Sequence, residues 1–475
     1  FANANKRMVI DDNSRISLSN NDGGADNTVF GKLAGNALTT NGDENVLIGH
    51  EAGNDMTTGE RNVVIGYQAG DAMTIATRSV AIGYGALGTE DVGDRSIAIG
   101  FNALHSQNSD SNNETTGNVG IGVEAGFYNQ TGQYNTLIGT GAGLGASGQS
   151  NSQNTAVGYS SLNVITTGSN NVAMGMNSLR ALTSGTENVG IGKDSMYDAN
   201  TASGVVAVGT ESAYNITSGS ESVAIGKQAL YTATTVGANT AVGYQALKSN
   251  TVSGNTAVGH SALKNNSTAT GNTAVGYESA DAITTGGNNT AFGVASLGAT
   301  DDGVNNTALG AYAMGGNVGT SNTAVGSQAM TDSTGSYNTA LGMQSLFDCV
   351  AGVSNTVVGA LAMKFANAGE SENIAIGIEA MRDVEEGTNS RTADNNVAIG
   401  SMALKGGSLA GSQDLTHNVA IGYRAFDGTG VYGQLGTVAV GSQALGATTY
   451  GSANTAVGYN SGDTIITGSN NTLIG

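Results

Sequence analysis

The sequence contains no proline and no tryptophan, and only one of its 475 residues is a cysteine. A lone cysteine, Cys349, excludes a disulfide framework and a thiolate zinc site. The lack of proline fits a stack of central strands, because each strand then needs every backbone N–H for its ladder. The sequence also lacks a run of 18 apolar residues, so it predicts no membrane span.

Charge is scarce and mostly negative. Charged residues make up 11% of the chain, and the 37 acidic against 17 basic residues give a formal charge of −20. No basic face is present, which excludes nucleic acid as a partner. Gly, Asn, Thr and Ser dominate the remainder, a composition typical of disorder. Apolar residues at fixed positions argue against disorder and for a repeat.

The repeat is a five-residue phrase, Asn-Thr-Ala-Val-Gly at Asn239–Gly243, that occurs 26 times between Asn27 and Gly475. Its commonest spacing is 17 residues. Asn occupies position 1 in 21 copies, and position 2 is always Thr, Val or Ile. Position 3 is mostly Ala, position 4 is always large and apolar, and position 5 is always Gly. Such a unit repeated end to end predicts a solenoid.

Each position has a physical interpretation. β-branched residues at positions 2 and 4 favour a strand with both side chains on one face. The glycine allows a bend that a Cβ would oppose. Ala or Ser follows at position 8 in all 25 copies that reach it, and Leu or Met usually comes next. We expect position 8 to begin a second short strand, and a Thr-Thr-Gly stretch to close the coil.

The recurrent Asn predicts an amide ladder in which each side chain bonds to the one in the next coil. The residues assigned to this structural ladder are Asn239, Thr240, Val242, Gly243, Asn255, Val258, Gly259, Asn272, Val275 and Gly276. The predicted fold is therefore all-β, a parallel β-solenoid or β-roll of about 26 short coils.

Side-chain sizes bear on assembly. If Ala at position 3 faces Ala or Ser at position 8, the interior is thin and the Leu and Met residues at position 9 face outward with positions 2 and 4. An apolar stripe along many coils does not remain in water. We therefore expect cyclic association of identical chains around it.

Residues 1–26 lie outside the repeat and predict an N-terminal cap, with short strands at Met8–Ile10 and Ile16–Leu18. Residues 27–475 form the repeat shaft. Its spacing loosens in two regions, about 96–154 and 373–437. The chain begins with Phe and stops within a repeat, so we expect a processed or partial piece of a longer protein.

Extra residues in a solenoid bulge out as loops, and loops on a rigid scaffold often carry binding sites. The predicted loops are about 104–117, 144–153, 382–395, 404–417 and 426–436. Their unusual side chains are the candidates for receptor contact: His105, Arg382, Asp383, Glu385, Glu386, Arg391, His417 and Tyr432. Tolerated drift without a ligand is the alternative.

Catalytic chemistry has no clear support in the sequence. The four histidines are many coils apart, which excludes a histidine metal or catalytic cluster. No phosphate-binding loop precedes a lysine and a helix. We predict no enzyme, no cofactor and no metal. A polysaccharide-degrading spike stays as an alternative and requires a carboxylate pair in a groove.

The phrase Ser-Val-Ala-Ile-Gly at Ser79–Gly83 and Ser222–Gly226 resembles the head repeat of trimeric autotransporter adhesins of the YadA type. The longer Asn-Thr-Ala-Val-Gly-Tyr-x-Ala-Leu at Asn239–Leu247, with the entry Asp12–Asp22, is similar to bacteriophage tail fibres. The resemblance implies a parallel homotrimer.

The predicted function is accordingly a structural and attachment fibre, extracellular and part of a virion tail. Its expected partners are itself, a host-surface receptor or glycan, and other tail proteins. A bacterial surface adhesin with the same roll is the alternative.

Overall fold

The computed structural model describes residues 9–10, 16–17, 26–112, 114–316, 318–365, 369–384, 393–406, 414–428 and 434–475. The chain divides into two compact units, residues 1–238 and 239–475. Every regular element in the described residues is a β-strand. The all-β prediction is therefore confirmed.

The described residues of the first unit contain fourteen strands. They are β1 (Val9–Ile10), β2 (Ile16–Ser17), β3 (Thr28–Phe30), β4 (Val46–Ile48), β5 (Val63–Ile65), β6 (Val80–Ile82), β7 (Ile97–Ile99), β8 (Val119–Ile121), β9 (Thr136–Ile138), β10 (Thr155–Val157), β11 (Val172–Met174), β12 (Val189–Ile191), β13 (Val206–Val208) and β14 (Val223–Ile225). β1 and β2 pair antiparallel, with Ile10 opposite Ile16.

The part of the second unit that the structure describes also contains fourteen strands. They are β15 (Thr240–Val242), β16 (Thr256–Val258), β17 (Thr273–Val275), β18 (Thr290–Phe292), β19 (Thr307–Leu309), β20 (Thr323–Val325), β21 (Thr339–Leu341), β22 (Thr356–Val358), β23 (Ile374–Ile376), β24 (Val397–Ile399), β25 (Val419–Ile421), β26 (Val438–Val440), β27 (Thr455–Val457) and β28 (Thr472–Ile474).

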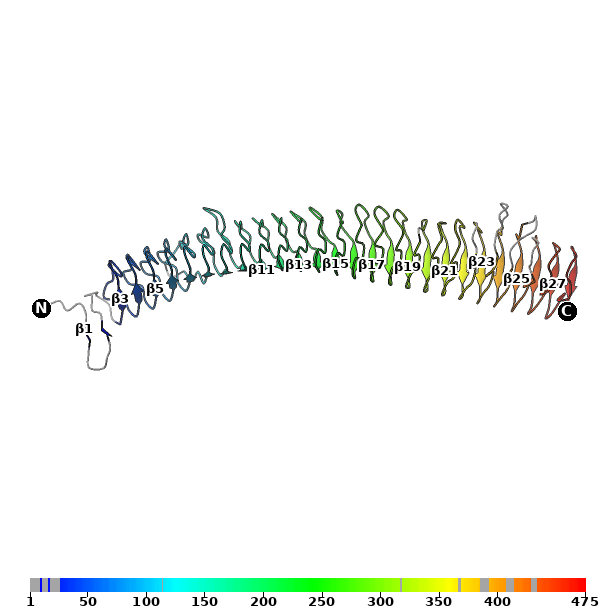
Figure 1. Cartoon of the computed structure of the whole chain (residues 1–475), viewed down its shortest axis with the longest axis horizontal. Helices are drawn as coiled ribbons and strands as arrows, with labels where there is room; N and C mark the ends of the chain where they lie inside the picture. The colour runs from blue at the N-terminus through cyan, green and yellow to red at the C-terminus, as the bar shows by residue number, and fades with distance from the viewer. Residues whose placement is uncertain are drawn as a thin grey trace, which may run out of the picture. The chain divides into compact units, whose positions relative to one another are not determined.

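The 26 repeat strands, β3–β28, coincide with the 26 copies of the phrase, and each covers positions 2–4. Within each unit, successive repeat strands pair in parallel along one side of the stack (Figure 1). The register aligns equivalent positions: Thr240 lies opposite Thr256, and Val242 lies opposite Val258. The fold is thus a parallel β-solenoid, as predicted.

The glycine at position 5 makes the bend after each strand. Gly243 has φ +136°, and a Cβ there would overlap the carbonyl oxygen of Gly259 in the next coil. Its backbone still continues the ladder, because the Gly259 N–H donates to the Val242 carbonyl at 2.7 Å. Only a residue without a side chain meets both conditions.

The predicted second strand is wrong. Residues after the glycine form a continuous turn in which left-handed residues alternate with others, as at Gln245 (φ +55°) and Leu247 (φ +51°). The segment nevertheless bonds from coil to coil, since Leu247 N–H donates to the Ala262 carbonyl at 3.0 Å. Alternating backbone hand therefore replaces strand geometry while preserving a parallel ladder.

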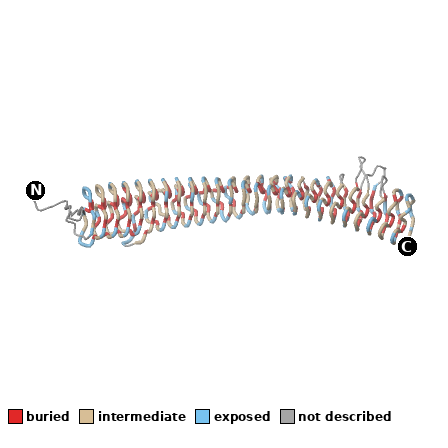
Figure 2. The backbone as a smooth tube through the Cα atoms, turned by 60° about the horizontal axis from the view of Figure 1, so that its bottom comes forward, coloured by how far each residue is buried: buried red, intermediate tan, exposed pale blue. Residues whose placement is uncertain are grey.

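The interior also differs from the prediction. Leu247 at position 9 is fully buried beside Ala241 and Ala246, and Met330 is equally buried. In both units, buried segments alternate with exposed turns around each coil (Figure 2). The Leu and Met side chains thus fill the interior instead of facing outward, because the alternating hand turns positions 8 and 9 to the same side. Only positions 2 and 4 remain on the sheet face.

Candidate functional site

The asparagines join neighbouring coils through backbone and side chain together. The Asn255 N–H donates to Asn239 Oδ1 at 3.0 Å, and the Asn272 N–H donates to Asn255 Oδ1 at 2.9 Å. Asn255 Nδ2 donates within its own coil to the Ala269 carbonyl at 2.9 Å. Direct amide-to-amide bonds occur in some coils, as from Asn62 Nδ2 to Asn45 Oδ1 at 3.1 Å. Each asparagine therefore ties one coil to the next and also closes its own coil.

The other assigned ladder residues surround this contact. Thr240 and Val242 lie at the two outward ends of β15, on either side of buried Ala241. The same arrangement holds around Val258 and Val275 in β16 and β17. In each unit, the outward side chains of the repeat strands at positions 2 and 4 form what we call the sheet face.

The sheet face is apolar at position 4 throughout both units. Its side chains are partly to largely solvent-exposed, with 52% exposure at Phe292 and 62% at Phe30. Position 2 is mainly Val or Ile in β4–β14 and is Thr in every strand from β15 to β22. A continuous exposed apolar column is uncommon on a soluble monomer and marks an interaction surface.

A second outward surface, at positions 7 and 10, is polar and aromatic. Gln68 Nε2 donates to Glu51 Oε2 at 2.8 Å, from position 7 to position 7 of adjacent coils. At position 10, the rings of Tyr197, Tyr214 and Tyr231 stack with centroids 5.1 and 5.3 Å apart. Burial, and then the nearby Asp198 carboxylate, raise the pKa of Tyr214. The polar and aromatic side chains of this surface are suited to contact with solvent or with a polar ligand.

Arg382 and Asp383 lie at positions 10 and 11 after β23. Arg382 pairs with Asp383 at 2.8 Å and with Glu379 at 3.1 Å, and Lys405 of the next coil reaches Glu379 at 3.0 Å. The hydrogen bond from Lys405, with the charge of Arg382, holds the pKa of Glu379 below its usual range. These groups neutralise one another and link two coils.

The two candidate histidines occupy regular positions of the repeat. His105 is at position 10, where its ring stacks on Phe127 at 5.1 Å. His417 directly precedes Asn418, and its N–H donates to the Asp394 carbonyl at 3.2 Å. They lie in different units. The remaining candidates, Glu385, Glu386, Arg391 and Tyr432, lie outside the described residues.

A buried carboxylate was missed by the sequence interpretation. Glu90 is fully buried at position 12, where the two preceding coils place Met56 and Met73. Its carboxylate accepts hydrogen bonds from the Gly93 N–H and from Gln107 Nε2, both at 2.7 Å. These donors supply the hydrogen bonds that a buried polar side chain requires. The replacement of Met by Glu at an interior position was the only signal in the sequence.

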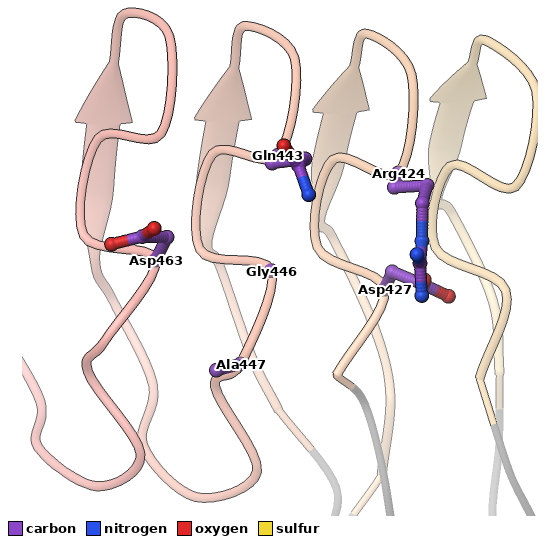
Figure 3. Close-up of a pocket in the computed structure, with 6 residues that line it drawn as sticks. All are labelled: Arg424, Asp427, Gln443, Gly446, Ala447 and Asp463. Atoms are coloured by element: carbon purple, nitrogen blue, oxygen red, sulfur yellow. The ribbon is translucent and has the colours of Figure 1, made fainter.

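One shallow hollow of about 220 Å³ lies on the second surface, beside the coils of β25, β26 and β27 (Figure 3). Gly446 and Ala447 leave the space open, and Gln443 and Asp463 also line it. Arg424 is held by Asp427 at 2.6 Å. The lining offers polar and charged groups of both signs without a deep enclosed chamber.

No group of three or more His, Cys, Asp or Glu side chains able to hold a metal ion occurs in the described ranges. Across those same ranges, no helix long and apolar enough to cross a membrane is present. Neither a protein-family model nor a curated protein matches this chain.

Proposed function

We propose that this chain is the shaft of an attachment fibre, built from identical parallel chains that pack through their sheet faces. The observation that carries the proposal is the outward, large apolar side chain at position 4 of every described coil. Strand edges offer little further surface for side-by-side packing, because the strands inside each stack already pair with the strands of the coils before and after them. The apolar face itself is therefore the surface available for burial.

The second surface supports the same arrangement. Its amide and carboxylate ladders, as between Gln228 and Glu211 at 2.8 Å, suit contact with water or receptor. A chain with one apolar and one polar outward surface buries the first against its copies and presents the second outside. Because each assembly repeats every outward group, weak contacts to a host glycan or receptor act together.

The resemblance to tail fibres and adhesin heads supports an order of three and a setting on a virion tail. The burial of Leu and Met at position 9 leaves position 4, together with position 2 where it is Val or Ile, as the outward apolar side chains. Each chain therefore buries more apolar surface in its own interior than the sequence predicts. The partners remain other tail proteins and a host-surface receptor or glycan.

Light scattering on the purified chain tests the assembly. We expect three times the chain mass of 47.1 kDa. Replacing Ile191 and Ile225 by Lys places charges on the sheet face and should return the mass to 47.1 kDa. The matched control, Thr201→Lys, changes an exposed side chain away from that face and should leave the trimer intact. A wild-type mass of 47.1 kDa would contradict the proposal.

Attachment is tested separately from assembly. A fluorescently labelled trimer should bind to the surface of host cells. It should not cleave their surface polysaccharide. Release of oligosaccharides by the purified protein would instead favour the polysaccharide-degrading alternative.

A further inference from the structure

The two edges of the sheet face carry matched residues. We call the residue directly before position 1 the entry residue and the residue at position 6 the exit residue. In the first unit, Lys occurs as the exit residue in three coils, those of β3, β12 and β14. In each of these coils the entry residue is acidic, giving the pairs Asp26 and Lys32, Glu187 and Lys193, and Glu221 and Lys227.

A second pairing occupies three consecutive coils of the same unit. Arg is the entry residue before β5, β6 and β7, and an aromatic ring is the exit residue after each of them. The pairs are Arg61 and Tyr67, Arg78 and Tyr84, and Arg95 and Phe101. All twelve side chains of the two sets are exposed. Acid with lysine and guanidinium with aromatic ring are both attractive pairs.

These pairs are not formed inside the chain. Entry and exit residues are six positions apart at opposite ends of a strand, up to about 20 Å when extended. Among the described residues, no ion pair within 4 Å joins an entry residue to its own exit residue, and Lys193 instead approaches Asp194 at 3.5 Å. Glu187 and Glu221 have no ion pair with any described residue within that limit. Nor does a described arginine at an entry position lie over its exit ring: Arg61 pairs within the chain with Glu44 at 2.6 Å, and the rings of Tyr67 and Tyr84 stack on each other at 5.3 Å.

We infer that, in an assembly of identical chains, the entry residues of one chain contact the exit residues of its neighbour in the same coil. The inference deepens the proposed function and rests on it. Rotation about an axis parallel to the stack brings the entry edge of one sheet face against the exit edge of the next. All chains then run parallel and stay at the same height.

The pairing also fixes the register. A stagger of one coil sets Lys193 against Gly204 in one direction and against Asn170 in the other, and neither carries a charge. A zero stagger matches all three lysines with acids at once. The surrounding apolar contacts bind without direction, so these edge pairs determine which coils face each other.

Zero-length carbodiimide cross-linking of the wild-type assembly tests this pairing, because it joins a carboxylate to an amine only when the two are in contact. Mixing chains with and without isotopic label before assembly separates links between chains from links within one chain. We expect interchain links from Lys193 to Glu187 and from Lys227 to Glu221. Glu187→Gln with Glu221→Gln should abolish them, whereas Glu211→Gln, on the second surface, should leave them unchanged.

The outcomes separate the two proposals. Interchain links between different coils, such as Lys193 to Glu221, would overturn the register. An intact trimer whose lysines link only within their own chain would overturn the edge pairing and leave the fibre proposal standing. A mass of 47.1 kDa would overturn both.

Discussion

Leu47 and Gly53 share the interior of one coil, with the leucine side chain filling the space that the glycine leaves. Leu47 Cδ2 lies 3.1 Å from the point where a Cβ on Gly53 would stand. In the coil of β6 the sizes are reversed, with Ala81 at position 3 and Leu87 at position 9, both fully buried. Since protein interiors are close-packed, these coils accept one large side chain at these two positions.

Exchanging the two sizes should therefore be tolerated only as a pair. Gly53→Leu alone overpacks the coil by about 1–3 kcal/mol, and Leu47→Ala alone leaves a cavity costing about 2–5 kcal/mol. The double variant recreates the arrangement of the β6 coil, with an expected coupling of about 0.5–3 kcal/mol. The backbone permits it, because Gly53 has φ +57° and Leu87 already adopts φ +49°. Urea unfolding measures the cycle, and additive losses would disprove the shared space.

The glycine at position 5 should be irreplaceable, unlike a glycine at the entry position. Gly243→Ala forces a Cβ onto the neighbouring Gly259 carbonyl at φ +136°, so we expect loss of soluble folded protein or a strongly lowered unfolding temperature. Gly254→Ala is the matched control, with nothing within 4 Å of the added Cβ. Ala238 adopts φ +54° at the equivalent site. Circular dichroism on heating compares the two, and equal melting would refute the steric explanation.

The strand positions, the bend and the parallel order followed from the phrase, because alternation and glycine act locally. The interior could not be predicted in the same way. A two-residue period assigns positions 8 and 9 to opposite faces, yet both are buried in Ala246 and Leu247. The cause is the positive φ of Leu247, which ordinary preferences for leucine disfavour. A side-chain pattern therefore does not predict burial at positions where the sign of φ decides which way the side chain points.

Spacing predicts which coils are longer, but not where each side chain lies within its coil. His105 and His417 were assigned to loops because the period lengthens beside them, yet both occupy ordinary coil positions. The entry and exit pairs could not be predicted from the sequence for a different reason. The pairing of Glu187 with Lys193 can be recognised only once the fold places them at opposite ends of one strand, both exposed and without contact. Complementarity between copies cannot be seen until contacts within the chain are known.

The asparagine ladder should fail when its acceptor is removed. Asn272 Oδ1 accepts from the Asn289 N–H at 2.8 Å, and its Nδ2 donates to the Gly286 carbonyl at 2.9 Å. Asn272→Ala leaves both buried groups without these partners, at about 1–3 kcal/mol each. Asn272→Ser should cost less, since Ser79 Oγ accepts from the Ser96 N–H at 3.3 Å in another coil. Hydrogen exchange at Asn289 reports the local loss; unchanged protection in the alanine variant would contradict the ladder.

Asp281 provides a pH dependence with a defined sign. Burial, and then the nearby Glu278 charge, raise its pKa above the ordinary value of 3.8. The folded chain consequently holds this proton more tightly than the unfolded chain, so ionisation disfavours the fold. That cost is complete above the folded pKa and vanishes as the pH falls below 3.8. Asp281→Asn, which keeps the shape without the charge, should therefore melt at a higher temperature than the wild type near neutral pH.

The same reasoning fixes how the difference must change with acidity. The stabilisation by Asp281→Asn should shrink as the pH is lowered and disappear below the ordinary aspartate pKa, because both chains are then neutral at this site. Glu278→Gln removes part of the cause and should shift the melting temperature in the same direction by a smaller amount. Thermal melts across this pH range provide the test. A gap between Asp281→Asn and wild type that stays constant, or widens in acid, would show that the gain arises from packing and not from the desolvated carboxylate.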